Sequence, residues 1–477
     1  MRLHQNSWRG RPLSAMSKLR HIGRATVLKA VILLIVSPFQ AVPVSASNAP
    51  DLLVRLISAH NLELRAKCLE DGSYRGDEGI LRVRPEVGMD LGLVVHLSPE
   101  FEQAMRLLHE AEGDLEAAKR AMRTQGVEKQ HGDHVRIIAE RFLEHKGKTQ
   151  KAQSLLRTYA AGLDASVDER LDTARCEALA AELLNRCLAK TGNRLRDALG
   201  CFANTCRGVP SPPFLTPENV RFVNAIFQAF VERAPKELLE GLDLDRLDPR
   251  QVAADWKKAT GAEEAHIVPH LETGLQKLDM DRLVSVDPLL FLALIRRESR
   301  FDPRAVSYMG AAGLTQIMPN TAEQMGMENV YRPSYFDQAF SLLREEREAR
   351  RAAMDALFAI TPENRFKSAA RARERMQASI RLSRERKSFF SRYQKELRVQ
   401  TSDPRLHPAQ AVEYGLRYFS TLMHQQEKDI SLALASYNAG PHRVRQYGGI
   451  PPYAETVRFR NLVLEFYREY LDKLGGK

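Results

Sequence analysis

The sequence predicts a mainly α-helical protein, and both its composition and its hydrophobic periodicity indicate this fold class. Long stretches are rich in Ala, Leu, Glu and Arg, which are strong helix formers, while Gly and Pro account for only 27 and 23 of the 477 residues. Apolar residues recur at three- and four-residue spacing in Pro99–Met122, Val135–Tyr159 and Val167–Leu188. A chain of this length exceeds one ordinary core, so two or three domains are expected.

The formal net charge of +11 is concentrated in two segments. Residues 1–46 hold seven Lys and Arg and no Asp or Glu, and residues 337–406 hold 17 Lys and Arg against 10 Asp and Glu. Proteins that bind nucleic acid carry a basic surface over a whole domain, so no nucleic-acid partner is expected here. The hydrophobic fraction of 44% is typical of a globular protein.

Residues 1–46 have the pattern of a signal peptide. A basic stretch precedes the apolar run Ala30–Val36, and Val44–Ala46 supplies the small residues of a cleavage site. The alternative is an N-terminal membrane anchor, although the apolar run is short and is interrupted by Pro38 and Pro43. We therefore expect export, with a periplasmic or secreted location.

Export makes disulfides possible. Four of the five cysteines flank the turn signal Thr191–Asn193, and these four are Cys176, Cys187, Cys201 and Cys206. Two antiparallel helices joined there would bring Cys176 towards Cys206 and Cys187 towards Cys201. We expect at least one disulfide among them and a free Cys68, with buried free thiols as the alternative; sequence alone leaves the pairing open. No histidines keep ligand spacing with these cysteines, so no metal is expected.

Residues 47–280 are expected to form a helical N-terminal region without a chemical motif. A linker or domain seam within it is marked by four prolines, Pro210, Pro212, Pro213 and Pro217. The segment Gly192–Phe202 faintly parallels Asp429–Tyr437 near the other end of the chain. This parallel indicates either a degenerate duplication or two amphipathic helices of similar composition. The region is also a candidate contact for cell-wall or secretion machinery proteins.

Residues 281–477 contain a predicted buried helix that leads directly to a glutamate. Asp287 is an N-cap followed by proline at the first helical position, and residues 289–295 are all apolar. Glu298 follows near the end of this helix, where desolvation and the helix dipole both raise its pKa, as a general acid requires. The alternative is a surface ion pair with the neighbouring arginines, which are Arg296, Arg297 and Arg300.

Glu298 begins an extended pattern. It reads Glu298-Ser299-x-Phe301-x-Pro303-x-Ala305-x-Ser307-x-x-Gly310-Ala311-x-Gly313-Leu314-x-Gln316-Ile317-Met318-Pro319-x-Thr321. Two shorter motifs follow in Ala435–Pro441 and Tyr453–Thr456. Together and in this order they closely resemble the catalytic domain of soluble lytic transglycosylases, over about residues 281–335 and 407–472.

The resemblance implies a lysozyme-like, mostly helical catalytic domain in residues 281–477. It also implies cleavage of the β-1,4 bond between N-acetylmuramic acid and N-acetylglucosamine in peptidoglycan glycan strands, with no cofactor or metal. Glu298 aligns with the catalytic glutamate of the family, and Ser307 with a polar residue near it. The family's groove-lining positions are occupied here by Gln316, Met318, Tyr437 and Asn438, and a further acidic position by Glu455.

The chain departs from the family pattern at three positions. Thr315 stands where methionine is usual, and we expect this change to alter sugar packing. Phe459 replaces a usual tyrosine and Arg460 a usual valine, which puts the contribution of the third motif in doubt.

The pattern supplies one acid/base carboxylate, whereas ordinary glycosidases use two. The other carboxylate of the first motif, Asp302, precedes Pro303 and fits a loop role better. The resemblance implies substrate assistance, in which Glu298 protonates the glycosidic oxygen and then takes the proton of the sugar's 6-hydroxyl, giving a 1,6-anhydromuramic acid end. The alternatives are a hydrolytic muramidase of the goose-type lysozyme kind and a glycan-binding scaffold.

Residues 337–406 replace a short connection of the family and are predicted to form an inserted basic helical hairpin. One helix is expected over Asp337–Ile360, and Thr361-Pro362 begins a second that runs to about Val399. Its positive charge can attract the carboxylates of peptidoglycan and hold the enzyme on the wall. The alternatives are a solvated spacer or a brace packed on the N-terminal region.

Overall fold

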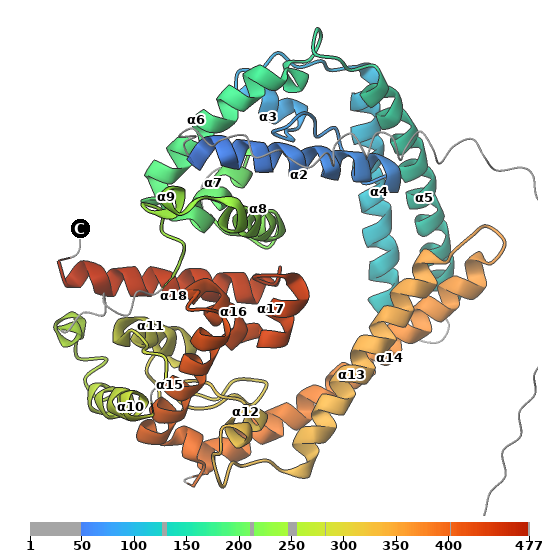
Figure 1. Cartoon of the computed structure of the whole chain (residues 1–477). Coiled ribbons are helices and arrows are strands. Elements are labelled where there is room, and N and C mark those ends of the chain that lie inside the picture. Colours follow the sequence, from blue (N-terminus) through green and yellow to red (C-terminus); the bar gives the residue numbers. More distant parts are fainter. Residues whose placement is uncertain are drawn as a thin grey trace, which may run out of the picture. The chain divides into compact units, whose positions relative to one another are not determined.

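The computed structural model describes residues 49–125, 131–209, 214–246, 255–281, 283–400 and 402–475, and every regular element in these ranges is a helix (Figure 1). The first half contains α2 (Ala49–Asp71), α3 (Pro85–Asp90), α4 (Pro99–Arg123), α5 (His131–Ala161), η2 (Glu169–Leu171), α6 (Thr173–Thr191), α7 (Leu195–Cys206), α8 (Val220–Arg233) and α9 (Lys236–Leu239). The second half contains η4 (Trp256–Ala259), α10 (Val268–Met280), α11 (Pro288–Ser299), α12 (Pro319–Gln324), α13 (Ser334–Phe358), α14 (Arg365–Val399), η5 (Pro404–Leu406), α15 (Pro408–Gln425), α16 (Ile430–Ala439), α17 (Pro441–Tyr447) and α18 (Ala454–Lys473). The predicted all-α fold class is confirmed.

Local sequence explains where several helices begin. The side chains of Ser98, Asp287 and Asp429 accept hydrogen bonds from backbone N–H groups in the first turns of α4, α11 and α16. The helix predicted from residue 167 was wrong at its start, because two caps stand close together there. Asp168 caps the short η2, and Asp172 caps α6, which begins only at residue 173.

Residues 1–48 lie outside the described residues, and so do the expected signal peptide and three of the four linker prolines, Pro210, Pro212 and Pro213. Among the described residues, no helix combines the length and the hydrophobicity needed to cross a bilayer.

Helix α11 is the centre of the C-terminal core. Its residues 289–295 are completely buried, as the all-apolar run predicted, and they pack with residues of α10, α15, α16 and α18. Trp256, Ile267 and Leu271 belong to the same apolar cluster. The boundary expected at residue 280 is therefore too late, because residues 256–280 cover this core and belong with the C-terminal region.

The expected inserted hairpin is formed by α13 and α14, and its tip packs on α4 and α5 (Figure 1). Leu357 and Met376 lie in an apolar cluster that they share with Met122 of α4 and with α5. The Arg373 side chain donates to the carbonyl of Thr124 at 2.9 Å, and a glutamine one turn further donates to the carbonyl of Met122 at 2.7 Å. The hairpin is thus packed on the N-terminal region as a brace, while arginines on its other faces remain exposed.

The two halves of the chain contain the same buried clasp of an aspartate, an arginine and a tyrosine. In each clasp the arginine donates to the aspartate, to the tyrosine hydroxyl and to two loop carbonyls. The N-terminal clasp joins Arg170 to Asp168 at 2.7 Å, Tyr159 at 2.7 Å, Gly76 at 2.8 Å and Val83 at 3.1 Å. The C-terminal clasp joins Arg405 to Asp403 at 2.8 Å, Tyr393 at 2.8 Å, Gly310 at 3.0 Å and Ile317 at 3.3 Å.

The elements around the two clasps follow the same order. Each half has a helix, a turn closed by an isolated β-bridge, a short helix starting with proline, a long helical hairpin, a 3₁₀ turn that carries the clasp, and further helices. Gly79 and Gly313 have φ of 70° and 75°, and at each a Cβ would lie 1.7 Å from the carbonyl oxygen of the clasp arginine. The parallel between Gly192–Phe202 and Asp429–Tyr437 is therefore part of a longer repeat, which favours duplication over similar composition.

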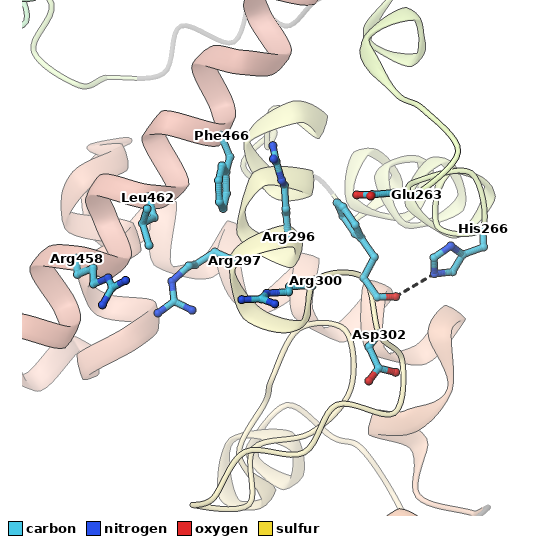
Figure 2. Close-up of a pocket in the computed structure, with 10 residues that line it drawn as sticks. Glu263, His266, Arg296, Arg297, Arg300, Asp302, Arg458, Leu462 and Phe466 are labelled. Atoms are coloured by element: carbon cyan, nitrogen blue, oxygen red, sulfur yellow. Dashed lines mark hydrogen bonds between the residues drawn. The ribbon is translucent and has the colours of Figure 1, made fainter.

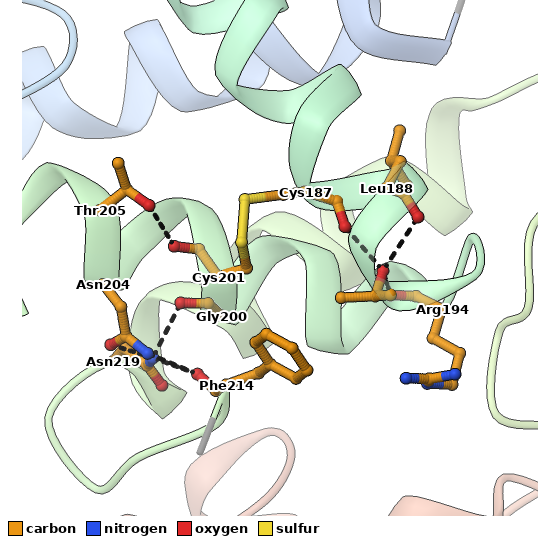
Figure 3. Close-up of a disulfide and its surroundings, with 10 residues drawn as sticks. Cys187, Leu188, Arg194, Gly200, Cys201, Asn204, Thr205, Phe214 and Asn219 are labelled. Carbon is orange, nitrogen blue, oxygen red and sulfur yellow. Dashed lines mark hydrogen bonds between the residues drawn. A yellow bond between two sulfur atoms is a disulfide. The ribbon is translucent and has the colours of Figure 1, made fainter. Parts of the chain in front are cut away.

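A disulfide joins α6 to α7, as expected from the cysteine spacing (Figure 3). It links Cys187 to Cys201 with a Cα–Cα distance of 5.8 Å. Cys176 and Cys206 are free and buried, so the second suggested pairing is absent from the structure, and Cys68 is free as expected. Burial raises the pKa of the Cys176 thiol to about 11 and that of Cys206 to about 12, which keeps both protonated and poorly reactive.

Candidate active site

Glu298 lies in the last turn of α11, at the edge of the C-terminal core. Residues 289–295 of this helix are fully buried, whereas Glu298 is half-buried. The helix ends immediately afterwards because Arg300 adopts a left-handed conformation with φ of 53°. The buried helix thus carries a carboxyl group to the boundary between core and solvent.

The surroundings of Glu298 favour its protonated form. Burial raises the pKa of Glu298 to about 8, Arg297 opposes this shift, and the negative charge of Glu455 adds to it. The alternative of a surface ion pair does not hold for Arg296, which instead pairs with Glu469 at 2.6 Å. At neutral pH Glu298 is therefore mostly a proton donor.

Tyr437, on α16, lies close enough to Glu298 for the glutamate charge to contribute to its electrostatics. The Tyr437 hydroxyl donates to the carbonyl of Thr315 at 2.6 Å, and its ring is parallel to that of Phe459 with centroids 6.5 Å apart. Burial, followed by the charge of Glu298, raises the pKa of Tyr437 well above its usual value, so the hydroxyl stays protonated. The structure thus gathers Glu298, Tyr437 and Glu455, which come from three different helices.

Asn438 is fixed by the third motif. Its side-chain oxygen accepts from the Thr456 hydroxyl at 2.8 Å, which ties the end of α16 to the first turn of α18. The second and third motifs therefore act as one unit.

The loop after α11 is held by the remaining predicted site residues. The Ser307 hydroxyl accepts from the Ala311 N–H at 2.9 Å, and the Gln316 side-chain nitrogen donates to the carbonyls of Ala305 and Gly313 at 3.0 and 2.9 Å. Gln316 has φ of 48°, and Met318, half-buried, precedes α12 as its N-cap residue. The hydrogen bonds of Ser307 and Gln316 go to loop backbone, so the structure assigns both to loop shape; contact with a sugar stays a prediction.

The departures from the family pattern have structural explanations. The Thr315 side chain is buried and donates to the carbonyl of Ala411 at 3.0 Å, so it faces α15 rather than the surface. A direct contact between Thr315 and a sugar, as the expected effect on sugar packing would require, is therefore not supported. Phe459 provides the ring beneath Tyr437. Arg460 is buried and donates to Asp197 at 2.8 Å and to Asp245 at 2.9 Å, both outside the catalytic motifs.

A pocket of about 770 Å³ opens around the end of α11 (Figure 2). It is lined by Glu263, His266, Arg296, Arg297, Arg300, Phe301, Asp302, Arg458, Leu462 and Phe466. Figure 2 shows Arg297, Arg300 and Arg458 on one side and Glu263, His266 and Asp302 on the other. His266 contacts the carbonyl of Phe301 at 3.1 Å. Within the described ranges, no group of three or more His, Cys, Asp or Glu is arranged to hold a metal ion.

Sequence reasoning missed most of this pocket. Arg458, Leu462 and Phe466 lie at the spacing of one face of α18, and only packing against α11 reveals that they meet Arg297 and Arg300. The cluster Arg296–Arg300 is visible in the sequence, but there it predicts only ion-pair partners for Glu298.

With this geometry established, residues 282–339 and 384–456 match the family model described as the Transglycosylase SLT domain. The C-terminal region is a transglycosylase SLT domain. The match is interrupted over residues 340–383, which form most of the α13–α14 hairpin. The family resemblance predicted from the sequence is confirmed.

Individual relatives match either a short part of the chain or a long part of it at low sequence identity. A transglycosylase of Enterobacteria phage PRD1 is 42% identical over 50 residues, which are 10% of this chain and 19% of that protein. The chain therefore spans about a fifth of the length of this curated relative. An inactive mutant of the lytic transglycosylase Slt from Pseudomonas aeruginosa is similar with a TM-score of 0.25 and 15% identity, covering 79% of this chain and 52% of that one. The 70 kDa soluble lytic transglycosylase from Escherichia coli gives 0.26 and 14%, covering 91% and 74%.

Proposed function

We propose that this protein is a lytic transglycosylase that cleaves the β-1,4 bond between N-acetylmuramic acid and N-acetylglucosamine in peptidoglycan. The observation that carries the proposal is Glu298, a carboxyl with its pKa raised to about 8 at the end of the buried helix of an SLT domain. A carboxylic acid that stays protonated at neutral pH can donate to a leaving oxygen. Substrate in the bacterial wall implies an exported enzyme, in agreement with the signal peptide expected in residues 1–46.

In the first step, protonated Glu298 donates its proton to the glycosidic oxygen as the bond to C1 of muramic acid breaks. Positive charge develops at C1, and the N-acetyl group of the same sugar stabilises it through its carbonyl oxygen. The Tyr437 hydroxyl, fixed on the carbonyl of Thr315, and the amide of Asn438 provide a preorganised polar wall beside the reacting sugar.

In the second step, Glu298 is a carboxylate and acts as the base. It removes the proton of the muramic acid 6-hydroxyl, whose oxygen attacks C1 and closes a 1,6-anhydro ring. The proton returns to Glu298, so the enzyme is regenerated and no water is consumed. One glutamate therefore serves both steps, which explains why the site needs a single acid/base group.

Glu455 supports hydrolysis as a second candidate reaction. Its carboxylate is exposed and lies near enough to contribute to the raised pKa of Glu298. Two carboxylates on either side of a sugar are the arrangement of a hydrolytic glycosidase, in which the second one activates water. A muramidase of the goose-type lysozyme kind would use Glu455 in this way.

Mass spectrometry of purified sacculi digested by the mature protein separates these reactions. The proposal expects muropeptides with anhydro ends, each lighter by one water than the hydrolysis product. Reducing muramic acid ends as the main product would establish the muramidase instead. Binding without any cleavage, by a protein whose folded state is confirmed by circular dichroism, would leave only the glycan-binding scaffold.

A further inference from the structure

The place that corresponds to Glu298 in the N-terminal half can be located from ring contacts. In the SLT domain, Arg297 lies 5.6 Å from the centroid of Phe459, which stacks on Tyr437. In the N-terminal half, the ring of His60 on α2 lies 5.8 Å from that of Phe222, which stacks on Phe202 with centroids 6.4 Å apart. His60 thus matches Arg297, and the next residue, Asn61, matches Glu298.

Asn61 cannot act as an acid. Its side chain is buried, 5% exposed, and donates to the carbonyl of Ile80 at 2.7 Å. The neighbouring turn is closed by Glu78, which is completely buried and accepts from Arg65 at 2.9 Å and from the Tyr74 hydroxyl. The N-terminal half therefore repeats the fold without a proton donor. Where the SLT domain has Glu298, it has the neutral amide of Asn61, and the nearby Glu78 carboxylate is buried and fully hydrogen-bonded.

The two halves meet through a buried cluster of charges. Arg196 at the start of α7 donates to Asp429 at 2.6 and 2.9 Å, and Arg460 of α18 donates to Asp197 at 2.8 Å and to Asp245 at 2.9 Å. All five side chains are buried. An interface of this kind has a defined geometry, because a small displacement would leave a buried charge without its partner.

This cluster holds the two helices that carry the second and third motifs. Asp429 is the N-cap of α16, which ends with Tyr437 and Asn438. Arg460 follows Phe459, the ring that stacks on Tyr437, and also donates to Ser431 in the first turn of α16 at 2.8 Å.

We infer that residues 49–233 are a second, non-catalytic copy of the SLT fold, and that this copy positions α16 and α18 beside Glu298. The positioning role rests on the proposed function of Glu298. Asp197 is its main positioning residue on the N-terminal side, because it accepts from Arg460 and also binds Arg468 at 3.0 Å.

The test compares two buried aspartates, each replaced by its isosteric amide. Asp197→Asn weakens the junction of the two copies, whereas the control Asp168→Asn weakens the clasp inside the N-terminal copy. Both variants should have a lower Tm. Only Asp197→Asn should lower kcat, on the order of 10-fold to 10²-fold for a misplaced site. It should also shift the alkaline limb of the pH profile to lower pH, because Tyr437 and Glu455 move away from Glu298 and its pKa falls. Equal pH profiles in both variants would overturn the positioning role.

Two further measurements keep the result interpretable. If Asp197→Asn does not fold, Ser431→Ala removes one hydrogen bond of Arg460 and should produce the same shift at smaller amplitude. The pKa of Glu298, read by carbon-13 NMR as the difference between each variant and its Glu298→Gln double, needs no turnover. A shifted pKa in a protein that does not cleave peptidoglycan would support positioning and reject the proposed function.

Calorimetric titration of Glu298→Gln with a purified glycan fragment tests whether the second copy binds substrate. It should give one binding site per chain, and two sites would overturn the inference that the second copy is inactive.

The arginine side of the pocket in Figure 2 supports a second, independent proposal. Arg296 is paired with Glu469, but within the described ranges no carboxylate lies within ion-pair distance of Arg297, Arg300 or Arg458. The Nε of Arg297 is buried without a hydrogen-bond partner among the described residues. Three unpaired guanidinium groups around one pocket favour an anionic ligand, and planar carboxylates suit them best.

We propose that this pocket binds a carboxylate of the substrate strand. The proposal rests on the proposed function. Peptidoglycan offers two sources of that group, the stem peptides and the lactyl group of peptide-free muramic acid.

The experiment uses the Arg300→Gln/Arg458→Gln double variant and, as control, Arg304→Gln, an exposed arginine of the same loop outside the pocket. KM for peptide-bearing strands should rise about 10-fold in the double variant, as expected for the loss of charged hydrogen bonds, and stay unchanged in the control. Peptide-free strands that keep the lactyl carboxylate identify the source: a similar rise assigns the lactyl group, and no rise assigns the peptide. Affinity for a chitooligosaccharide without carboxylates should change much less. An unchanged KM for all strands in an enzyme that cleaves them would reject the subsite and leave the proposed function intact.

Discussion

Glu298 differs from residues 289–295 of α11 by being half-buried, and this position controls its chemistry. One turn earlier the side chain would lie in the core with no access to substrate, and two residues later the chain leaves the helix at Arg300. Arg297 counteracts the desolvation of Glu298 without forming an ion pair with it, so the pKa settles at about 8. The sequence placed Glu298 correctly, because a buried helix and its C-terminal end can both be recognised from residue order.

Replacing Glu298 by glutamine should abolish cleavage of sacculi. The amide keeps the shape but cannot move a proton, and acid/base assistance contributes roughly 10²- to 10⁴-fold to a rate. Because one residue serves both steps, we expect a loss at or beyond the upper end of this range. Release of muropeptides measures it, and an unchanged Tm with retained glycan binding is the control. Activity near that of the wild type would remove Glu298 from its role.

The pH profile should report the same residue. A carboxyl with pKa about 8 donates its proton below that pH, so kcat/KM is expected to fall as the pH rises through about 8. The negative charge of Glu455 contributes to the raised value, so Glu455→Gln should move this alkaline limb to lower pH. A limb that stays in place would show that Glu455 does not act on Glu298, and a limb that moves to higher pH would contradict the direction of the interaction.

At the scale of helices, the sequence predicted elements better than their partners. Proline after the capping residue Asp287 located the start of α11 to the residue, the apolar spacing from Pro99 located the start of α4, and the two helices of the inserted hairpin also carry buried apolar faces. That stripe could not reveal that Leu357 and Met376 pack on α4 and α5, because a helix face shows that it is buried but not what buries it. The sequence also could not predict that Asp197 and Arg460 are buried and paired, because charged residues are usually exposed and these two come from different halves of the chain.

The brace can be tested at its apolar tip. Leu357 is completely buried between the two hairpins, so Leu357→Ala should lower stability by about 2–5 kcal/mol, the usual cost of such a cavity. Arg371→Ala on an exposed face of the same hairpin is the matched control and should change little. Chemical denaturation gives both values. Equal stabilities would mean that the two hairpins are not held together in solution.

For the whole chain, the repeat explains how a long N-terminal region without a motif can matter to a small site. The two copies touch at the charge cluster, at a shared apolar cluster that includes Ile450 and Val457, and again at the hairpin tips, so the second copy supports the first at three places. The N-terminal copy therefore supports the site through interface residues such as Arg196 and Asp197, while Asn61 stands at its own counterpart of the acid.

The charge cluster should make the junction of the copies sensitive to acid. Burial alone would raise the pKa of Asp197, but Arg460 and Arg468 outweigh burial and hold that pKa well below its usual value. The pKa of Asp245 is lowered for the same reason by Arg460 and Arg196, whereas burial prevails at Asp429 and raises its pKa. A carboxyl with a lowered pKa stabilises the folded state above its unfolded pKa of about 3.9, and this contribution disappears as the pH falls towards the folded value.

We therefore expect the two copies to lose their contact as the pH is lowered below about 4, with Asp429 acting slightly in the opposite sense because its protonation relieves a desolvated charge. The variant Asp197→Asn should be less stable than the wild type at pH 7 by about 3–5 kcal/mol, the usual cost of removing one partner of a buried pair. Its stability should also depend less on pH between about 4 and 2, because an amide has no proton to gain. Denaturation curves of both proteins across this range measure the difference. Parallel pH dependences would locate the acid-sensitive groups elsewhere in the chain, and the junction would then owe its geometry to the hairpin tips instead.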